Sequence, residues 1–297
     1  MNEFREMIMD GIRKRHSKCS VMVERIKGNN GTSYEGFLVK LNDTQCFPVI
    51  PCEGMECALR DEERTLEEVL DEVDRILGDR VDLDASFFSD YENIKKKIFL
   101  RVINKEQNKE LLEYAPHREF LDLAITYRIG PIHTGKAEGN TLVTYSMFQT
   151  WGITEDELYR IAYENSFKEY PEIMSMAKLL GRIFSDSDEE LDLSLHGLTG
   201  SKDIMYVCGY KSIAGAACML NKSLFQNFSK EVETDLLILP SSIYELIILP
   251  MKESYSTEVF VQMVDTVNRN NVPANEILSG HIYKYDRRMD EIIDLCA

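Results

Sequence analysis

Residues 236–250 read LLILPSSIYELIILP, and the fold expected for this chain is built around them. The aliphatic runs Leu236–Leu239 and Leu246–Leu249 are each followed by a proline, with a short polar segment between the two runs. Short apolar runs bounded by turn residues are typical of strands buried within a sheet. The stretch therefore predicts two buried strands joined by a tight polar connection.

Strands are expected in adjacent pairs elsewhere as well. The alternating runs Ser20–Ile26 and Tyr34–Leu41 predict a hairpin, because Asn30 and Gly31 between them tolerate the positive φ of a tight turn. Paired strands without strict strand–helix alternation indicate an α+β fold. We expect mixed or antiparallel sheets flanked by helices.

Two helices have clear signals. Thr65 and Glu68 form a capping box, and apolar residues follow at helical spacing as far as Gly78, so a helix is expected over residues 65–77. A second helix is expected over Thr257–Asn268. Its predicted apolar face consists of Phe260, Met263, Val264 and Val267.

Three segments are expected along the chain. Residues 1–90 read as a small N-terminal α-β-β-β-α unit, whereas residues 91–184 and 193–297 each read as a strand–helix–strand–strand–helix module. The very polar run Ser185–Asp192 is the expected boundary between the two modules, which can also form one domain.

The two modules show signs of an internal repeat. The same element order is predicted from Ile98 to Ser166, including a strand at Thr141–Phe148, and again from Ala214 to Asn268, opening with a strand at Ala214–Leu220. Similar tripeptides, INK at 103–105 and LNK at 220–222, precede the first helix of each module. Duplication and chance similarity both remain open.

The composition restricts the kinds of partner. The chain has 51 acidic and 34 basic residues and a formal net charge of −17, so it repels phosphate backbones and anionic membranes. We therefore expect no direct binding of duplex nucleic acid and no membrane association. A basic protein is the partner that the charge favours, although such a charge equally suits a protein that is only highly soluble; the oligomeric state is open.

A cytoplasmic location is expected. No apolar stretch approaches the length of about 20 residues that spans a bilayer, and the first residues lack the pattern of a signal peptide. The seven cysteines are odd in number and scattered, which is typical of reduced thiols.

Candidate site residues gather at the central turn. Ser241, Ser242 and Glu245 lie between the two buried strands, and His281 could act as the base for a nucleophilic serine. The alternative is that the serines and Glu245 bond to backbone groups of the turn, as these residue types often do. Nothing in the sequence places His281 within reach of them.

No metal site and no cofactor are predicted. The five histidines have no paired metal-binding spacing. The segment Gly130–Lys136 (GPIHTGK) matches part of a phosphate-binding loop, but Ala137 replaces the required hydroxyl and a strand rather than a helix is expected to follow. This segment is therefore predicted to be the tip of a hairpin.

Several stretches together resemble a known family. They are INKEQNKELLEYAPHREF at Ile103–Phe120, WGITEDEL at Trp151–Leu158, the central stretch, and ILSGHIYKYD at Ile277–Asp286. The chain resembles an uncharacterised bacterial domain of unknown function that is common in gut anaerobes and sometimes found on mobile elements. The resemblance covers most of the chain and implies no catalytic residue.

Three functions remain open, with enzyme status uncertain and an accessory, protein-binding role leading. This accessory role predicts an exposed apolar patch. A hydrolase or transferase with its site near Ser241, Ser242 and Glu245 predicts a pocket with convergent polar groups and perturbed pKa values. An acidic DNA-mimic inhibitor predicts acidic residues spaced like phosphates along one face.

Overall fold

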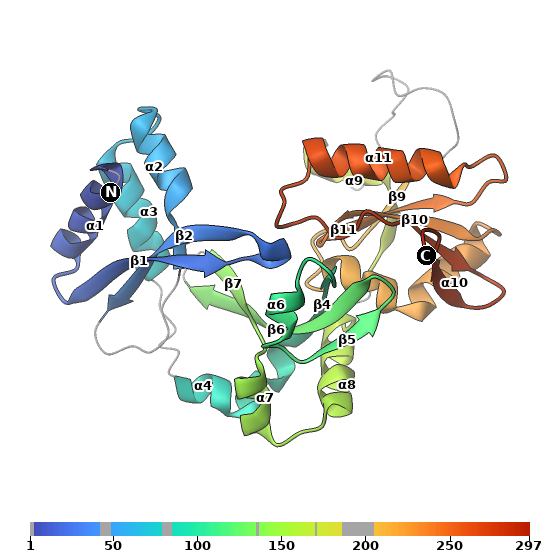
Figure 1. Cartoon of the computed structure of the whole chain (residues 1–297), viewed down its shortest axis with the longest axis horizontal. Helices are drawn as coiled ribbons and strands as arrows, with labels where there is room; N and C mark the ends of the chain where they lie inside the picture. The colour runs from blue at the N-terminus through green and yellow to red at the C-terminus, as the bar shows by residue number, and fades with distance from the viewer. Residues whose placement is uncertain (1–2, 42–48, 79–84, 135–136, 170, 186–204) are drawn as a thin grey trace. The chain divides into compact units, whose positions relative to one another are not determined.

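The computed structural model describes the chain except for residues 1–2, 42–48, 79–84, 135–136, 170 and 186–204 (Figure 1). The described residues form an α+β protein with three antiparallel sheets, which confirms the predicted fold class. They divide into two compact units. Unit 1 contains residues 1–98 and 128–154, and unit 2 contains residues 99–127 and 155–297. The three segments predicted from the sequence have other bounds and stay a prediction.

Unit 1 contains the predicted N-terminal hairpin. Cys19 pairs with Leu41 and Lys27 with Ser33, in the order β1-β2-β3. In the turn, Asn30 and Gly31 have φ angles of 57° and 65°, as predicted from their residue types. The elements are α1 (Glu3–Arg15), β1 (Cys19–Lys27), η1 (Asn29–Gly31), β2 (Ser33–Leu41), β3 (Val49–Pro51), α2 (Cys52–Arg60) and α3 (Leu66–Gly78).

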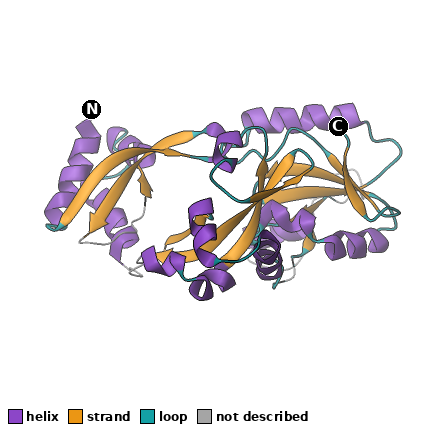
Figure 2. Ribbon diagram, turned by 60° about the horizontal axis from the view of Figure 1, so that its bottom comes forward, coloured by secondary structure: helices purple, strands orange, loops and turns teal. Residues whose placement is uncertain are grey.

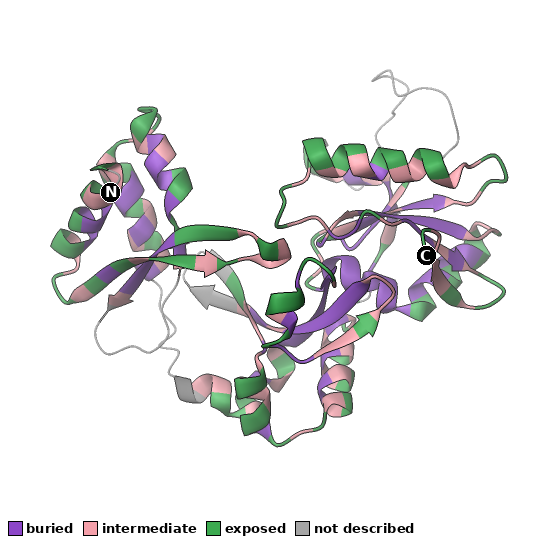
Figure 3. Ribbon diagram, viewed as in Figure 1, coloured by how far each residue is buried: buried purple, intermediate pink, exposed green. Residues whose placement is uncertain are grey.

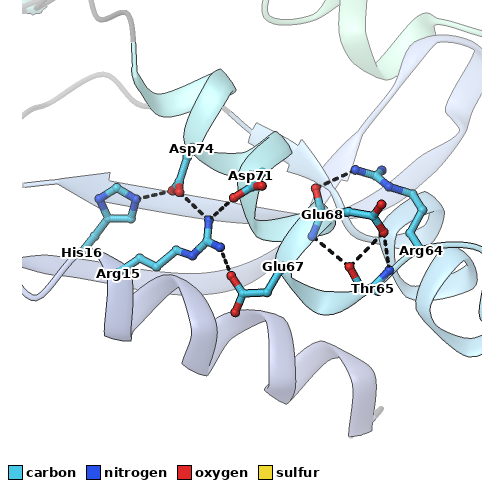
Figure 4. A network of polar contacts seen from close by, with 8 residues as sticks. All are labelled: Arg15, His16, Arg64, Thr65, Glu67, Glu68, Asp71 and Asp74. Carbon is cyan, nitrogen blue, oxygen red and sulfur yellow. Dashed lines mark hydrogen bonds and ion pairs between the residues drawn. The ribbon is translucent and has the colours of Figure 1, made fainter.

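The three helices α1, α2 and α3 share one hydrophobic core with this sheet. Ile8, Phe37 and Val69, from α1, β2 and α3, are completely buried in it. A polar network also joins α1 to α3 (Figure 4). The Arg15 guanidinium donates to Glu67, Asp71 and Asp74 of α3, and the His16 imidazole lies 2.7 Å from Asp74.

The predicted capping box at the start of α3 is present. The Glu68 carboxylate accepts from the Thr65 backbone N–H at 2.7 Å, and Thr65 Oγ1 accepts from the Glu68 N–H at 3.3 Å (Figure 4). These bonds satisfy donors that the first helical turn leaves without backbone partners.

Replacing Thr65 by alanine is therefore expected to lower the free energy of unfolding by about 1 kcal/mol. Urea unfolding measures this loss, and Thr65→Ser, which keeps the hydroxyl, is the control. Equal stability of the alanine and serine variants would contradict the cap.

The remainder of unit 1 corrects one strand prediction. A strand was expected at Thr141–Phe148, but β7 ends at Leu142 and α7 begins at Tyr145. Thr144 Oγ1 accepts from the Met147 N–H at 3.3 Å, and this N-cap begins the helix. The elements are α4 (Ala85–Ser89), α5 (Tyr91–Ile94), η2 (Lys95–Lys97), β7 (Ala137–Leu142) and α7 (Tyr145–Trp151).

The described part of the segment resembling a phosphate-binding loop, residues 130–134, lies in a strand that pairs with the next one, whereas residues 135–136 lie outside the described residues. Strand β6 (Leu123–Thr134) runs antiparallel to β7, with Ile132 opposite Gly139 and Thr134 opposite Ala137. No helix N-terminus follows the glycine-rich segment, because its described neighbour is a strand.

Unit 2 is built around the predicted central strands. Leu236–Ser242 forms β10 and Glu245–Pro250 forms β11, and they pair at the centre of a six-stranded antiparallel sheet with the order β13-β12-β10-β11-β9-β8. Leu236 and Ile238 are completely buried. The other strands are β8 (Ile173–Ser175), β9 (Tyr206–Cys208), β12 (Tyr283–Asp286) and β13 (Glu291–Asp294).

Helices cover both faces of this sheet (Figure 2). Ile247 and Val207 pair with each other, and paired residues project to the same face of a sheet. Ile247 packs in the cluster beneath α11 (Thr257–Asn270), and Val207 packs in the cluster beneath α9 (Met176–Ser185). On the opposite face, Phe225 and Phe228 of α10 (Lys222–Glu231) pack against sheet tyrosines. The runs are apolar throughout because both faces are covered.

The strand predicted to open the second module of the repeat is wrong. Ala214–Leu220 does not form a strand, because Gly215 has a φ of 56° and residues Gly215–Leu220 form the 3₁₀ helix η4. The first-module elements are β4 (Ile98–Asn104), α6 (Lys109–Leu112), β5 (His117–Phe120), β6 and α8 (Glu155–Ser166). In both modules the strand before the first helix pairs with the second strand of the following hairpin, as β4-β6-β5 and β9-β11-β10.

The two similar tripeptides also act alike. Asn104 Oδ1 accepts from the Gln107 N–H at 2.9 Å, and Asn221 Oδ1 accepts from the Leu224 N–H at 3.2 Å. Both asparagines are buried. This common role supports duplication, which stays a prediction. The predicted linker Ser185–Asp192 lies outside the described residues except for Ser185, at the end of α9.

Candidate functional site

The serines of the central turn bond within the turn. Ser241 Oγ donates to Glu245 Oε1 at 3.3 Å, and Ser242 Oγ accepts from the Tyr244 N–H at 3.1 Å. The pairing register shifts between Pro240 and Ser242, so local side-chain bonds replace part of the regular ladder. This is the structural role that was weighed against a nucleophilic serine.

The backbone of the same turn is fixed from several sides. Ile243 O accepts from the Ala216 N–H and from Arg101 Nη1, both at 3.2 Å, and the Ile243 N–H donates to Glu276 O. The buried Arg101 guanidinium lies 5.1 Å from the centre of the Tyr244 ring. These contacts hold the turn rigidly within unit 2.

His281 belongs to a different polar cluster. Its Nδ1 lies 2.7 Å from Asp294 Oδ2 and 3.9 Å from Asp122 Oδ2. Asp122 accepts from Ser279 Oγ at 2.5 Å and from Tyr283 Oη at 2.6 Å, and the His281 N–H donates to Ser279 Oγ. The hydrogen bonds of His281 thus go to this cluster, whereas those of Ser241 and Ser242 stay in the turn.

The register of the sheet brings the cluster together. Tyr283 of β12 pairs with Asp294 of β13, and the Leu295 N–H donates to Ile282 O. The same register places His281 opposite Cys296, and residues two apart project to the same face. Asp122 comes from the turn between β5 and β6.

Electrostatics in the cluster follow from burial and charge. Burial raises the pKa of the Tyr283 hydroxyl, and the carboxylate of Asp122 raises it further. Burial lowers the pKa of His281, but its hydrogen bond to the Asp294 carboxylate and the charge of Asp122 outweigh that effect, so the net shift of the pKa is upward. His281 keeps 40% of its side chain exposed.

This cluster also offers ligand atoms for a metal ion. One nitrogen, one carboxylate oxygen and one sulfur, from His281, Asp294 and Cys296, lie within 4.8 Å of one another. Sequence reasoning identified His281 but missed Asp122, Asp294 and Cys296, whose proximity depends on strand pairing. The sequence did show that Asp294 and Cys296 are two residues apart and so can project to the same face. This spacing became informative only once the pairing of β12 with β13 placed both residues beside His281.

Unit 1 contains a hollow of about 450 Å³ with mixed charge. Arg5 in its wall forms ion pairs with Glu35 at 2.8 Å and Glu56 at 2.5 Å. Burial raises the pKa of the Cys52 thiol, also in the wall, to about 11. Cys52 is thus mostly protonated near neutral pH and is a poor nucleophile.

Helix α11 presents an exposed apolar stripe. Much of α11 is exposed (Figure 3). Val259, Met263 and Val267 are 55%, 48% and 39% exposed, and their spacing of four residues places them along one side of the helix. Val264 is buried over the sheet, where Phe260 also packs. The single apolar face predicted for this helix is therefore divided between the core and solvent.

Within the described residues, no helix is long and apolar enough to cross a membrane. The fold defines the chain as an α+β protein whose central antiparallel sheet has helices on both faces.

The chain belongs to DUF5688, a family of unknown function whose model matches residues 1–287. No curated protein and no solved structure matches the chain significantly. The predicted resemblance to a domain of unknown function is thereby confirmed.

Proposed function

We propose that this chain is an accessory protein that binds another protein through α11. The observation that carries the proposal is the stripe Val259–Met263–Val267, which stays exposed although the adjoining side of the helix, with Phe260 and Val264, completes the core. Single exposed apolar residues are ordinary, whereas a continuous apolar line on one helix is typical of an interaction surface.

The proposed partner segment is an amphipathic helix with basic residues beside its apolar face. An apolar stripe on a helix matches another helix with apolar residues at the same spacing. The basic flanks are inferred from the net charge of −17 and from Glu258 in the first turn of α11, whereas Asp265 already pairs with Arg269 of the same helix. Charge complementarity favours encounter with such a segment.

The test uses a labelled amphipathic peptide of about five helical turns, with leucines on one face and lysines elsewhere. Fluorescence anisotropy measures its binding to the full chain. We expect Met263→Glu to weaken binding at least about tenfold, because it places a charge in an apolar contact. Met289→Glu is the matched control, since Met289 is 63% exposed and lies outside α11.

Two outcomes would contradict the proposal. Equal effects of Met263→Glu and Met289→Glu would mean that the acidic chain attracts the peptide by charge alone. A dimer in sedimentation velocity that Met263→Glu dissociates would assign the stripe to a second copy of this chain.

The two alternative functions are supported by fewer observations than the accessory role. The hydrolase or transferase alternative requires reactive serines, whereas Ser241 and Ser242 have partners within their turn. The DNA-mimic alternative still rests on net charge. A bacterial origin, an association with mobile elements and a cytoplasmic location are proposals that rest on the sequence.

A further inference from the structure

We propose that His281, Asp294 and Cys296 bind a divalent transition-metal ion of the zinc class. The inference is independent of the proposed protein-binding surface on α11. Its starting point is the convergence of three different ligand atoms within 4.8 Å at the paired ends of β12 and β13.

The donor set determines the class of ion. Imidazole nitrogen, carboxylate oxygen and thiolate sulfur together suit Zn²⁺ and its spectroscopic substitute Co²⁺, whereas Mg²⁺ and Ca²⁺ prefer oxygen ligands alone. Zinc–ligand bonds of about 2.0–2.3 Å allow a single ion to reach all three atoms after small side-chain movements. Three protein ligands leave one position for water or a further ligand.

The proposed ligands are oriented by bonds around them. Asp294 Oδ1 accepts from the Cys296 N–H at 2.8 Å, so that Oδ2 is the oxygen directed at His281 Nδ1. The backbone N–H of His281 donates to Ser279 Oγ, which in turn donates to Asp122 and so fixes the chain at His281. Such outer bonds pre-organise metal ligands and influence their affinity.

Charge at the cluster also favours a cation. Asp294 and Asp122 place two carboxylates beside His281, at 2.7 Å and 3.9 Å from Nδ1. A dication that takes the place of the proton between Nδ1 and Asp294 Oδ2 would bind both atoms directly. Asp122, already bonded to Ser279 and Tyr283, would act from outside the coordination sphere.

In the experiment, the metal-free full chain is titrated with Co²⁺ alone, and the bound Co²⁺ is then displaced by Zn²⁺. We expect one equivalent to bind, with a sulfur-to-cobalt absorption band in the near ultraviolet. Cys296→Ser should abolish this band and weaken Zn²⁺ binding about 100-fold or more, whereas Cys57→Ser should change neither. Cys296 is exposed, so its replacement leaves the core intact, and circular dichroism checks the fold.

A second measurement locates the site. Zn²⁺ should protect Cys296 from alkylation, as read by peptide mass spectrometry, and Asp294→Asn should remove most of this protection. Identical cobalt spectra for wild type and Cys296→Ser, or binding only at millimolar metal without a fixed stoichiometry, would overturn the proposal.

Discussion

Replacing Asp122 by alanine is expected to lower the free energy of unfolding by about 3 kcal/mol. The carboxylate accepts hydrogen bonds from Ser279 and Tyr283, whose residues are 1% and 0% exposed. Without Asp122, two buried hydroxyls lose their acceptor, and each such loss costs about 1–3 kcal/mol. Urea unfolding measures the change as a lower midpoint with an unchanged slope.

The control for this prediction is Tyr283→Phe, alone and combined with Asp122→Ala. The phenylalanine variant removes the buried hydroxyl together with its need for a partner, so we expect the double variant to lose less stability than the sum of the single variants. Strictly additive losses, or a loss below 1 kcal/mol for Asp122→Ala, would show that Asp122 does not tie the β5–β6 turn to β12.

Gly209→Ala is expected to destabilise the chain by about 3 kcal/mol or more. Gly209 has a φ of 92°, which an L side chain rarely adopts, and such strain costs about 1–3 kcal/mol. A Cβ there would lie 2.5 Å from Gly215 O and 3.0 Å from Tyr244 O. Both are backbone atoms within packed structure, so neither can move aside as a flexible side chain would.

Gly280→Ala is the matched control, because its Cβ would have no atom within 4 Å. We expect its stability to stay within about 0.5 kcal/mol of wild type. Thermal unfolding of the two alanine variants side by side makes the comparison. Equal stabilities would contradict the close approach of η4 and the central turn to Gly209.

Whether the serines of the central turn form a site with His281 depends on the distances between their side chains. Residue types allowed Ser241, Ser242, Glu245 and His281 to be read as one site. The serines and Glu245 bond within the turn, whereas His281 bonds to Asp294, thirteen residues later, and lies near Asp122, far earlier in the chain. The hairpin of β12 and β13 brings Asp294 there, and its register, rather than the residue types, decides which side chains face His281.

Local errors have an equally physical origin. The run 214–220 was read as a strand because it is apolar throughout, but Gly215 has a positive φ and the alanines are weak strand formers, and residues Gly215–Leu220 form a 3₁₀ helix. At 141–148, Thr144 acts as an N-cap and ends the extended segment early. In both places a single backbone or capping interaction outweighed the apolar pattern.

The sequence by itself determined the class of fold, the buried pair β10 and β11, the N-terminal hairpin and the cap of α3. These features depend on residues close together in the chain, where periodicity and turn chemistry act directly. Tertiary structure decided which strand opens the second module, which apolar residues of α11 stay exposed and which groups meet His281. Those outcomes depend on strand register and on which surfaces are covered, and both are set by contacts between distant residues.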